Sequence, residues 1–444
     1  MRPEFAYRAP GGLETGLLFL AFALQLGVAG ELLVLLGWDI GGDSGAAYTR
    51  FHPGTYLLFM ALGLAALRYG NPLLYLDALA REPRAAACLI LSLFVVGWDI
   101  RSGFSFTGPI EAFVVPAIFC LLLSEQDDRF ERRLALFMHA MMALNALLAI
   151  AQYGSLVPRL GEYDNARSSG LLGHPLTNGC ISALYILSLG LGGGRDLPRG
   201  MGLMAIALQL AALPTFGART STVIAVVGLV LIMIAGLGRS IFVPPSRRAV
   251  LAALTLGPLA LLVGDILYEV GFFTPLIARF MDDSGSTNAR LVLPTLIHNL
   301  TPEQFWFGVP SADIGAILMR EGIEYGIESF WFGTIVLHGA LAAAMLWAAY
   351  GAFSLHTIYK ARPMPALFVA LAHTIIISSA NSISTKSNQL DFVIVIVVCM
   401  LRRERPVASP AVRPVQKRER RPVGAVGQVV MARPLRPSRL PPAS

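Results

Sequence analysis

A polar stretch from Arg167 to Gly179 contains residue types that bind anionic ligands, in a chain that is otherwise mostly apolar. It reads Arg-Ser-Ser-Gly-Leu-Leu-Gly-His-Pro-Leu-Thr-Asn-Gly. Arg167 offers a planar fork of donors that matches a phosphate, and Gly170 and Gly173 let the backbone approach closely. Pro175 suits the first turn of a following helix, whose free N–H groups also favour an anion. An ordinary polar loop that enters a helix would have the same spacing.

Two further arginines are candidates for the same ligand. Arg219 lies between two apolar segments, and Arg290 begins an amphipathic stretch. A guanidinium so placed is costly unless it is paired or faces a polar cavity. If these two side chains converge with Arg167, they suit a diphosphate or another polyanion. The alternative is three independent arginines at the surface, with their stems along apolar groups.

Four side chains are candidates for proton transfer: His174, His298, Glu324 and Glu328. Glu328 lies at the expected mouth of an apolar span, where it would act as a general base if it faces a half-dry cavity. A carboxylate at the start of a helix is also often only a partner of the helix dipole. His298 is equally compatible with a surface residue.

Other motifs point away from metal or nucleotide chemistry. The acidic pair Asp282 and Asp283 lies in a Ser/Gly-rich segment and is interpreted as solvated. The sequence has no phosphate-binding Walker loop, serine-nucleophile elbow or zinc-protease helix. Its four cysteines are isolated in apolar segments. We therefore expect no metal, no cofactor and no nucleic-acid partner.

The elements that must position these residues are predicted to be membrane helices. The chain has 444 residues, of which 55% are hydrophobic and 14% charged, against about 25% charged in soluble proteins. Apolar runs near 20 residues recur, which predicts an all-α polytopic membrane protein with about twelve spans. The expected spans are 17–38, 54–69, 85–99, 109–124, 134–152, 175–193, 201–217, 220–238, 249–270, 329–350, 366–381 and 388–401.

Lys and Arg in the connections predict the orientation. The segment 402–444 is rich in Arg and Pro, which predicts a disordered, basic, cytoplasmic tail after a membrane domain of residues 1–401. With twelve spans the N-terminus is cytoplasmic too. The connections 153–174 and 271–328 then face outside, and the amphipathic piece 289–300 is predicted to lie on the membrane surface.

Four segments, in order, resemble the O-antigen ligase and polymerase superfamily of bacterial envelope polysaccharide synthesis. They are Arg167–Pro175, Gly217–Ser221, Asn288–Arg290 followed by Trp306–Val309, and Ile327–Trp331. The resemblance covers residues 140–350. O-antigen ligases usually carry a His-Asn pair in the fourth segment, where this chain reads Ile-Glu-Ser. The chain is more similar to the exopolysaccharide polymerases of the xanthan-polymerase type.

The resemblance implies a metal-independent glycosyltransferase with a GT-C-like fold in the bacterial inner membrane. The donor would be a glycan on undecaprenyl diphosphate, and the product an exopolysaccharide or O-antigen-type polymer at the periplasmic face. Arg167, Arg219, Arg290 and His174 would bind the diphosphate. Glu328, with His298 behind it, would act as the base in an inverting transfer. A chain-length regulator and a flippase of the same pathway would be partners, besides the lipid bilayer.

Three alternatives remain open. A ligase would transfer the glycan to another acceptor, and a flippase would use the same arginines as a transit site. A flippase predicts polar groups deep in several spans, whereas Asn145, Gln152, Gln209 and Asn381 are scattered, which disfavours it. A scaffold that docks synthesis enzymes through its tail should fail when residues 402–444 are deleted.

Overall fold

The computed structural model describes most of the chain up to residue 403. The described residues are 9–40, 47–70, 80–159, 167–198, 200–236, 265, 268–269, 271, 273–274, 277, 286–320, 323, 327–379, 383 and 387–403. At 286–291 and 311–312 only the backbone is described. Most of the ninth expected span, the acidic pair Asp282 and Asp283, and the tail after residue 403 lie outside the described residues.

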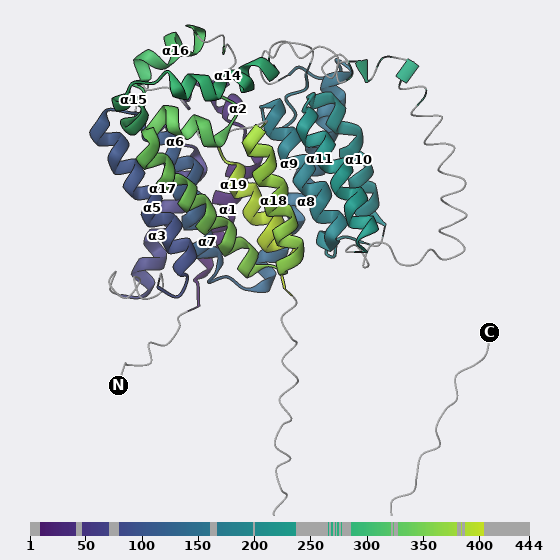
Figure 1. The fold of residues 1–444 in the computed structure, drawn as a ribbon. Helices are drawn as coiled ribbons and strands as arrows, with labels where there is room; N and C mark the ends of the chain where they lie inside the picture. The colour runs from purple at the N-terminus through teal and green to yellow at the C-terminus, as the bar shows by residue number, and fades with distance from the viewer. Residues whose placement is uncertain are drawn as a thin grey trace, which may run out of the picture. The chain divides into compact units, whose positions relative to one another are not determined.

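Helices account for all the regular elements of the described part (Figure 1). In the first half of the chain they are α1 Gly12–Gly27, α2 Gly30–Leu35, η1 Ala47–Thr49, α3 Pro53–Arg68, α5 Pro83–Ser102, α6 Thr107–Pro109, η2 Ile110–Val114, α7 Val115–Leu123, α8 Asp128–Tyr153, α9 Pro175–Ser188, η3 Leu189–Gly193, α10 Met201–Phe216 and α11 Arg219–Ile234. In the second half they are α14 Ser286–His298, α15 Pro302–Phe307, α16 Ser311–Arg320, α17 Phe330–Lys360, α18 Pro363–Ser379, α19 Gln389–Ile394 and η4 Val395–Met400.

Four of these helical segments are long and apolar enough to cross a membrane: α5, α8, α9 with η3, and α17. Seven shorter apolar helical segments accompany them in the described residues. The first expected span, 17–38, is instead broken into α1 and α2, because Val28 has an extended backbone. The tenth continues beyond residue 350, since α17 ends at Lys360. The described part of the chain is thus all-helical, with membrane-type helices.

α9 lies at the centre of the core. Nearly every residue from Pro175 to Gly193 is buried, and so is every residue from Gln389 to Leu401. Their side chains are almost all apolar or small, as expected for helices with neighbours on every side. α9 packs against α10, α11, α18 and α19. The core therefore fixes where the N-terminal end of α9, and the Arg167 stretch before it, must lie.

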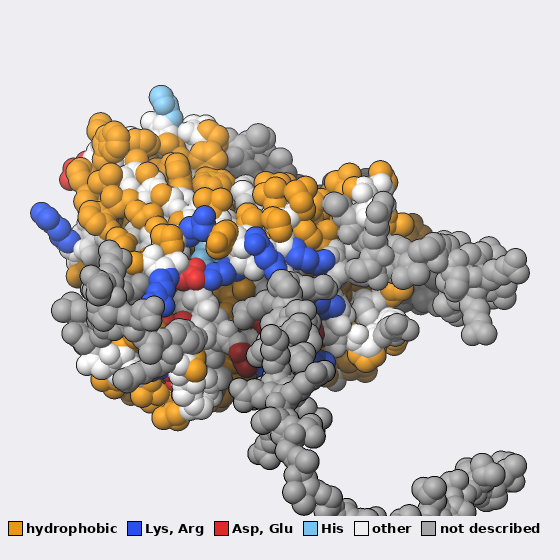
Figure 2. Space-filling model, turned by 90° about the horizontal axis from the view of Figure 1, so that it is seen from below, with side chains coloured by type: hydrophobic (Ala, Val, Ile, Leu, Met, Phe, Trp, Pro, Cys, Tyr) orange, Lys and Arg blue, Asp and Glu red, His pale blue; other side chains and the backbone are white. Residues whose placement is uncertain are grey.

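Polar contacts define two ends of the bundle. α5 and α17 are antiparallel, because Lys360 pairs with Glu82 at one end and His338 Nδ1 lies 3.1 Å from Asp99 Oδ1 near the other. α14, α15 and α16 lie at the second of these ends (Figure 1). We call the end with His338 and Asp99 the cap end, and the end with Lys360 and Glu82 the basic end. Figure 2 shows Lys and Arg side chains gathered on the basic end.

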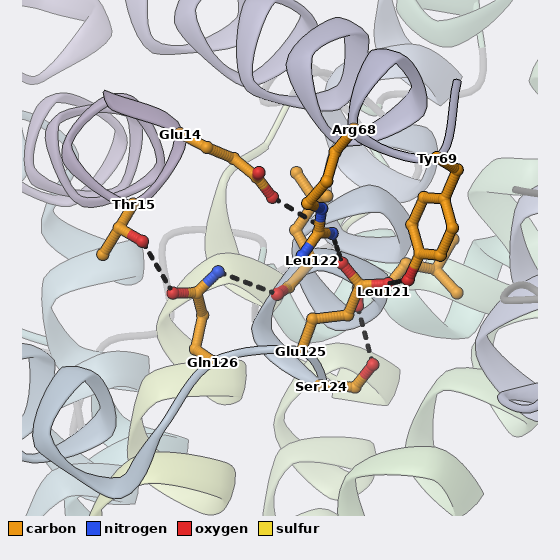
Figure 3. Close-up of polar contacts among 9 residues, drawn as sticks. All are labelled: Glu14, Thr15, Arg68, Tyr69, Leu121, Leu122, Ser124, Glu125 and Gln126. Atoms are coloured by element: carbon orange, nitrogen blue, oxygen red, sulfur yellow. Dashed lines mark hydrogen bonds and ion pairs between the residues drawn. The ribbon is translucent and has the colours of Figure 1, made fainter. Parts of the chain in front are cut away.

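A half-buried ion cluster ties three helices together at the basic end (Figure 3). Arg68 of α3 lies 3.3 Å from Glu14 of α1 and pairs with Glu125, just after α7. Tyr69 donates its hydroxyl to Glu125 over 3.1 Å. The Arg68 side chain is only 9% exposed, so water screens the cluster less than an ordinary surface pair.

Candidate anion-binding site at the cap end

The segment that follows Arg167 is fixed to α8 and α10 by its own polar groups. The Ser168 N–H donates to the Thr215 carbonyl over 2.9 Å, and its hydroxyl donates to the Ala149 carbonyl over 2.7 Å. The Gly170 N–H donates to Gln152 Oε1, also over 2.7 Å. These buried donors are all satisfied, so the loop is held in one conformation.

Two side-chain amides complete this support. The Leu171 N–H donates to Asn145 Oδ1 over 2.7 Å. Asn178, in the first turns of α9, donates to the Ser169 carbonyl over 2.6 Å and to the His174 carbonyl over 2.9 Å. Gly170 adopts φ +55°, and a Cβ there would lie 2.6 Å from Asn145 Oδ1 and 2.7 Å from Asn178 Oδ1. The position therefore requires glycine.

Arg167 is half-buried at the start of this loop. Its Nε is buried and makes no hydrogen bond with any described residue. A buried donor without a partner is costly, and an anion would remove that cost by accepting the bond. Within the segment Arg167–Pro175, Arg167 is therefore the residue best placed to bind a ligand.

Arg219 lies beside this loop, at the first residue of α11. Gly217, with φ +63°, makes the turn from α10, and Thr215 accepts the bond from Ser168. A Cβ on Gly179 of α9 would clash with Ala218, so the first turns of α9 and α11 are in close contact. The structure thus brings Arg167 and Arg219 to neighbouring loops where two helices begin.

His174 occupies the position before Pro175, as the N-terminal flanking residue of α9. Burial lowers the pKa of its imidazole, so the ring is neutral at physiological pH. A neutral imidazole can donate one hydrogen bond to a phosphate oxygen without adding charge. His174 is therefore a candidate anion-binding residue beside Arg167 and Arg219.

Arg290 and Glu328 lie on other elements at the cap end. Arg290 is in α14, and its side chain lies outside the described residues. α14 packs on α17 through Leu293, Leu296 and Val336. Glu328 is half-buried two residues before α17. His298 ends α14 and is exposed. Glu324 lies outside the described residues.

The interpretation of the amide side chains as scattered is wrong for three of the four. Asn145 and Gln152 support the Arg167 loop, and Gln209 donates to the Met142 carbonyl over 2.6 Å. Asn381 lies outside the described residues. The sequence carried a signal, because positions 145 and 152 are about two helical turns apart and share one face of α8. Asn178 was missed altogether.

The isolated cysteines and two histidines of the apolar helices lie in the core. All four cysteines are free and buried. His338 and His373 are buried, but each has a polar partner: Asp99 for His338, and the Tyr350 hydroxyl, 3.0 Å from His373 Nδ1.

Comparisons with known proteins add no relative. No protein-family model matches the chain, and a search of curated proteins finds no match.

Proposed function

We propose that the chain is a metal-independent inverting glycosyltransferase that polymerises undecaprenyl-diphosphate-linked repeat units. One observation supports this best: the rigid loop that presents Arg167, with an unpartnered buried Nε, next to Arg219 and the first turns of α9 and α11. Two arginines beside two helix starts suit a diphosphate. The apolar surface of the surrounding helices suits its lipid chain.

In this mechanism the arginines stabilise the charge that the diphosphate gains as it leaves the sugar. Arg167 and Arg219 bind it at the starts of α9 and α11, and Arg290, at a backbone position in α14, is the third proposed cation. Neutral His174 donates to a phosphate oxygen. Glu328 removes the proton from the acceptor hydroxyl, which attacks the anomeric carbon from the side opposite the diphosphate and inverts it. His298 is the weaker candidate for the base, because it is exposed.

The proposal includes a topology of about twelve spans with both termini in the cytoplasm of a bacterium, and a GT-C-like arrangement. The gathering of Lys and Arg on one end supports this orientation (Figure 2). The described candidate residues are all at the other end, which then faces the periplasm. A flippase would supply the lipid-linked repeats there, and a chain-length regulator would limit the polymer.

A direct test gives the purified full-length protein synthetic undecaprenyl-diphosphate-linked repeat units, with chelator and without nucleotide sugars. We expect a ladder of longer glycans and released undecaprenyl diphosphate. A single addition to a different acceptor would indicate a ligase instead. No transfer to any lipid-linked acceptor would refute the proposal.

A lipid-linked oligosaccharide flippase is the second candidate, and one observation favours it. Four buried polar residues from four elements, Gln25, Thr55, Glu111 and Asp391, lie among apolar helices. Such groups are typical of transporters. In vesicles, a flippase would move a lipid-linked oligosaccharide across the bilayer without lengthening it.

A further inference from the structure

A buried carboxylate network lies apart from the arginines, where α1, α3, η2 and α19 meet. Glu111 of η2 accepts three hydrogen bonds: from the His52 N–H over 2.8 Å, the Thr55 hydroxyl over 2.9 Å and the Gln25 amide over 3.2 Å. Glu111 is only 3% exposed. Both carboxylate oxygens of Glu111 therefore have donors, and the network holds this side chain in one position.

Asp391 of α19 lies close to this network without sharing its donors. It is fully buried, and neither carboxylate oxygen has a hydrogen-bond partner. The neighbouring Gln389 Oε1 is also buried and unpartnered. Asn388 fixes the start of α19 against α1, by donating to the Gln25 carbonyl over 2.6 Å. Asp391 and Gln389 thus contribute three buried oxygen acceptors that have no hydrogen-bond donor in the described part of the chain.

The charges around Asp391 make this arrangement unstable as it stands. α19 packs against α1, η2, α7, α9 and η4. In the described residues, the titratable groups that interact electrostatically with Asp391 are Glu111 of η2 and the Cys120 thiol of α7. Neither supplies a positive charge. Ionising both of these buried carboxyl groups is very costly unless a cation compensates them.

We propose that Asp391 and Glu111 form an exchangeable site for a monovalent cation, filled by a proton or by Na⁺. Oxygen acceptors without donors are what a hard cation needs. No three His, Cys, Asp or Glu side chains gather as a metal site in the described part of the chain, which favours a monovalent ion. π-helical turns such as η2 are frequent at functional sites. The site is independent of the glycosyl-transfer proposal.

The test uses the purified full-length protein in lipid nanodiscs. NaCl is titrated against N-methylglucamine chloride at constant ionic strength, and the melting temperature is measured at pH 6, 7.5 and 9. A bound ion raises the melting temperature with the logarithm of its concentration above Kd. For a Na⁺ site we expect this rise, larger at pH 9 than at pH 6, since protons compete for the same oxygens.

Variants assign the effect to the two carboxylates. Asp391→Asn should abolish the Na⁺-dependent rise, whereas Asp313→Asn, at an exposed position of α16, should leave it unchanged. Glu111→Gln should weaken Na⁺ binding by about tenfold or more, because a nearby opposite charge contributes at least that factor. If a variant does not fold, the Na⁺ titration of the wild-type protein still tests the proposed site.

Infrared spectroscopy distinguishes a site that binds a proton from one that binds Na⁺. If the site takes only protons, Na⁺ has no effect, and wild-type protein shows a protonated-carboxyl C=O band that disappears as the pH rises and is missing in Asp391→Asn. The proposal is overturned if Na⁺ has no effect and this band is either absent or unchanged over the whole pH range.

Discussion

Arg167 and Arg219 are placed differently from a snorkelling surface arginine. The Arg167 Nε is buried without a hydrogen bond, and Arg219 is half-buried at the first residue of a helix. An arginine that only anchors a helix at the interface would extend its guanidinium into water. At the scale of single residues, the geometry therefore favours ligand binding over anchoring.

Replacing either arginine should remove activity while the protein stays in the membrane. We expect Arg167→Ala and Arg219→Ala to lower polymer formation at least about 100-fold, the usual cost of losing one donor to a developing anion. Arg219→Lys should stay impaired, because an ammonium cannot form the bidentate fork. Arg101→Ala, at an exposed position at the end of α5, is the control. Normal polymer yield from both alanine variants would exclude the diphosphate role.

Glu328 is predicted to act on the acceptor. Glu328→Gln should lower turnover by about 100-fold or more, the contribution of a general base, while donor binding stays close to wild type. Turnover is measured by polymer sizing, and donor binding by titration with lipid-linked substrate. His298→Ala should have a much smaller effect. Wild-type turnover in Glu328→Gln would remove this residue as the base.

At the scale of elements, the Arg167 loop depends on α8, α9 and α10 together. Its buried N–H groups are bonded to Asn145, Gln152 and the Thr215 carbonyl. At Gly170 this support leaves no room for a side chain. The loop should therefore be sensitive to changes that leave both arginines intact.

Gly170→Ala should destabilise the protein by about 1–3 kcal/mol, the cost of a strained left-handed residue, and should lower polymer yield. Gly97→Ala, inside α5 with no atom within 4 Å of the added Cβ, is the matched control and should not destabilise. Thermal unfolding in detergent and polymer assays check both. Equal melting temperatures for the two variants would contradict the role of the loop.

A second element contact predicts a pH dependence. Arg402 donates two hydrogen bonds of 2.7 Å to Asp196, between η3 and α10. Burial opposes ionisation of Asp196, but Arg402 outweighs it and holds the pKa of the carboxyl below its ordinary 3.8. The stabilisation is therefore fully present above that value and is lost as the pH falls through the lower folded pKa.

Asp196→Asn should have a lower melting temperature than the wild type at pH 7. This difference in melting temperature should disappear as the pH falls below the ordinary carboxyl pKa of 3.8. Asp313→Asn should show no such pH-dependent gap. A constant gap from neutral to acidic pH would show that the contribution does not come from the ionised carboxylate.

At the scale of the whole molecule, the two ends of the bundle differ in chemistry. The basic end carries the clustered Lys and Arg side chains (Figure 2), whereas the cap end carries the candidate site and the helices α14 to α16. A polymerase that uses periplasmic lipid-linked repeats needs the cap end outside.

Cysteine labelling tests this orientation. The four native cysteines are buried, so a membrane-impermeant maleimide should react little with the wild type. Arg101→Cys, at the cap end, should be labelled in intact spheroplasts. Arg129→Cys, exposed in the first turn of α8 at the basic end, should be labelled only after permeabilisation. The reverse pattern would place the arginine site in the cytoplasm and exclude periplasmic polymerisation.

The sequence by itself determined the class of elements and the entry of the Arg167 stretch into a helix at Pro175. Apolar runs and a proline at a helix start are local signals, so they are readable along the chain. The amphipathic piece 289–300 likewise coincides with most of α14. Helix ends were less predictable, because a break such as Val28 has no clear local signature.

Only the tertiary structure decided what the polar residues do. Ser168, in the loop before α9, is bonded to Thr215 of α10, and η2 with Glu111 packs against α19 with Asp391 although the two segments are far apart in the sequence. Such contacts depend on how helices pack, which hydrophobic periodicity does not encode. For the same reason, a charged residue inside an apolar span can be recognised from sequence, but its partner cannot.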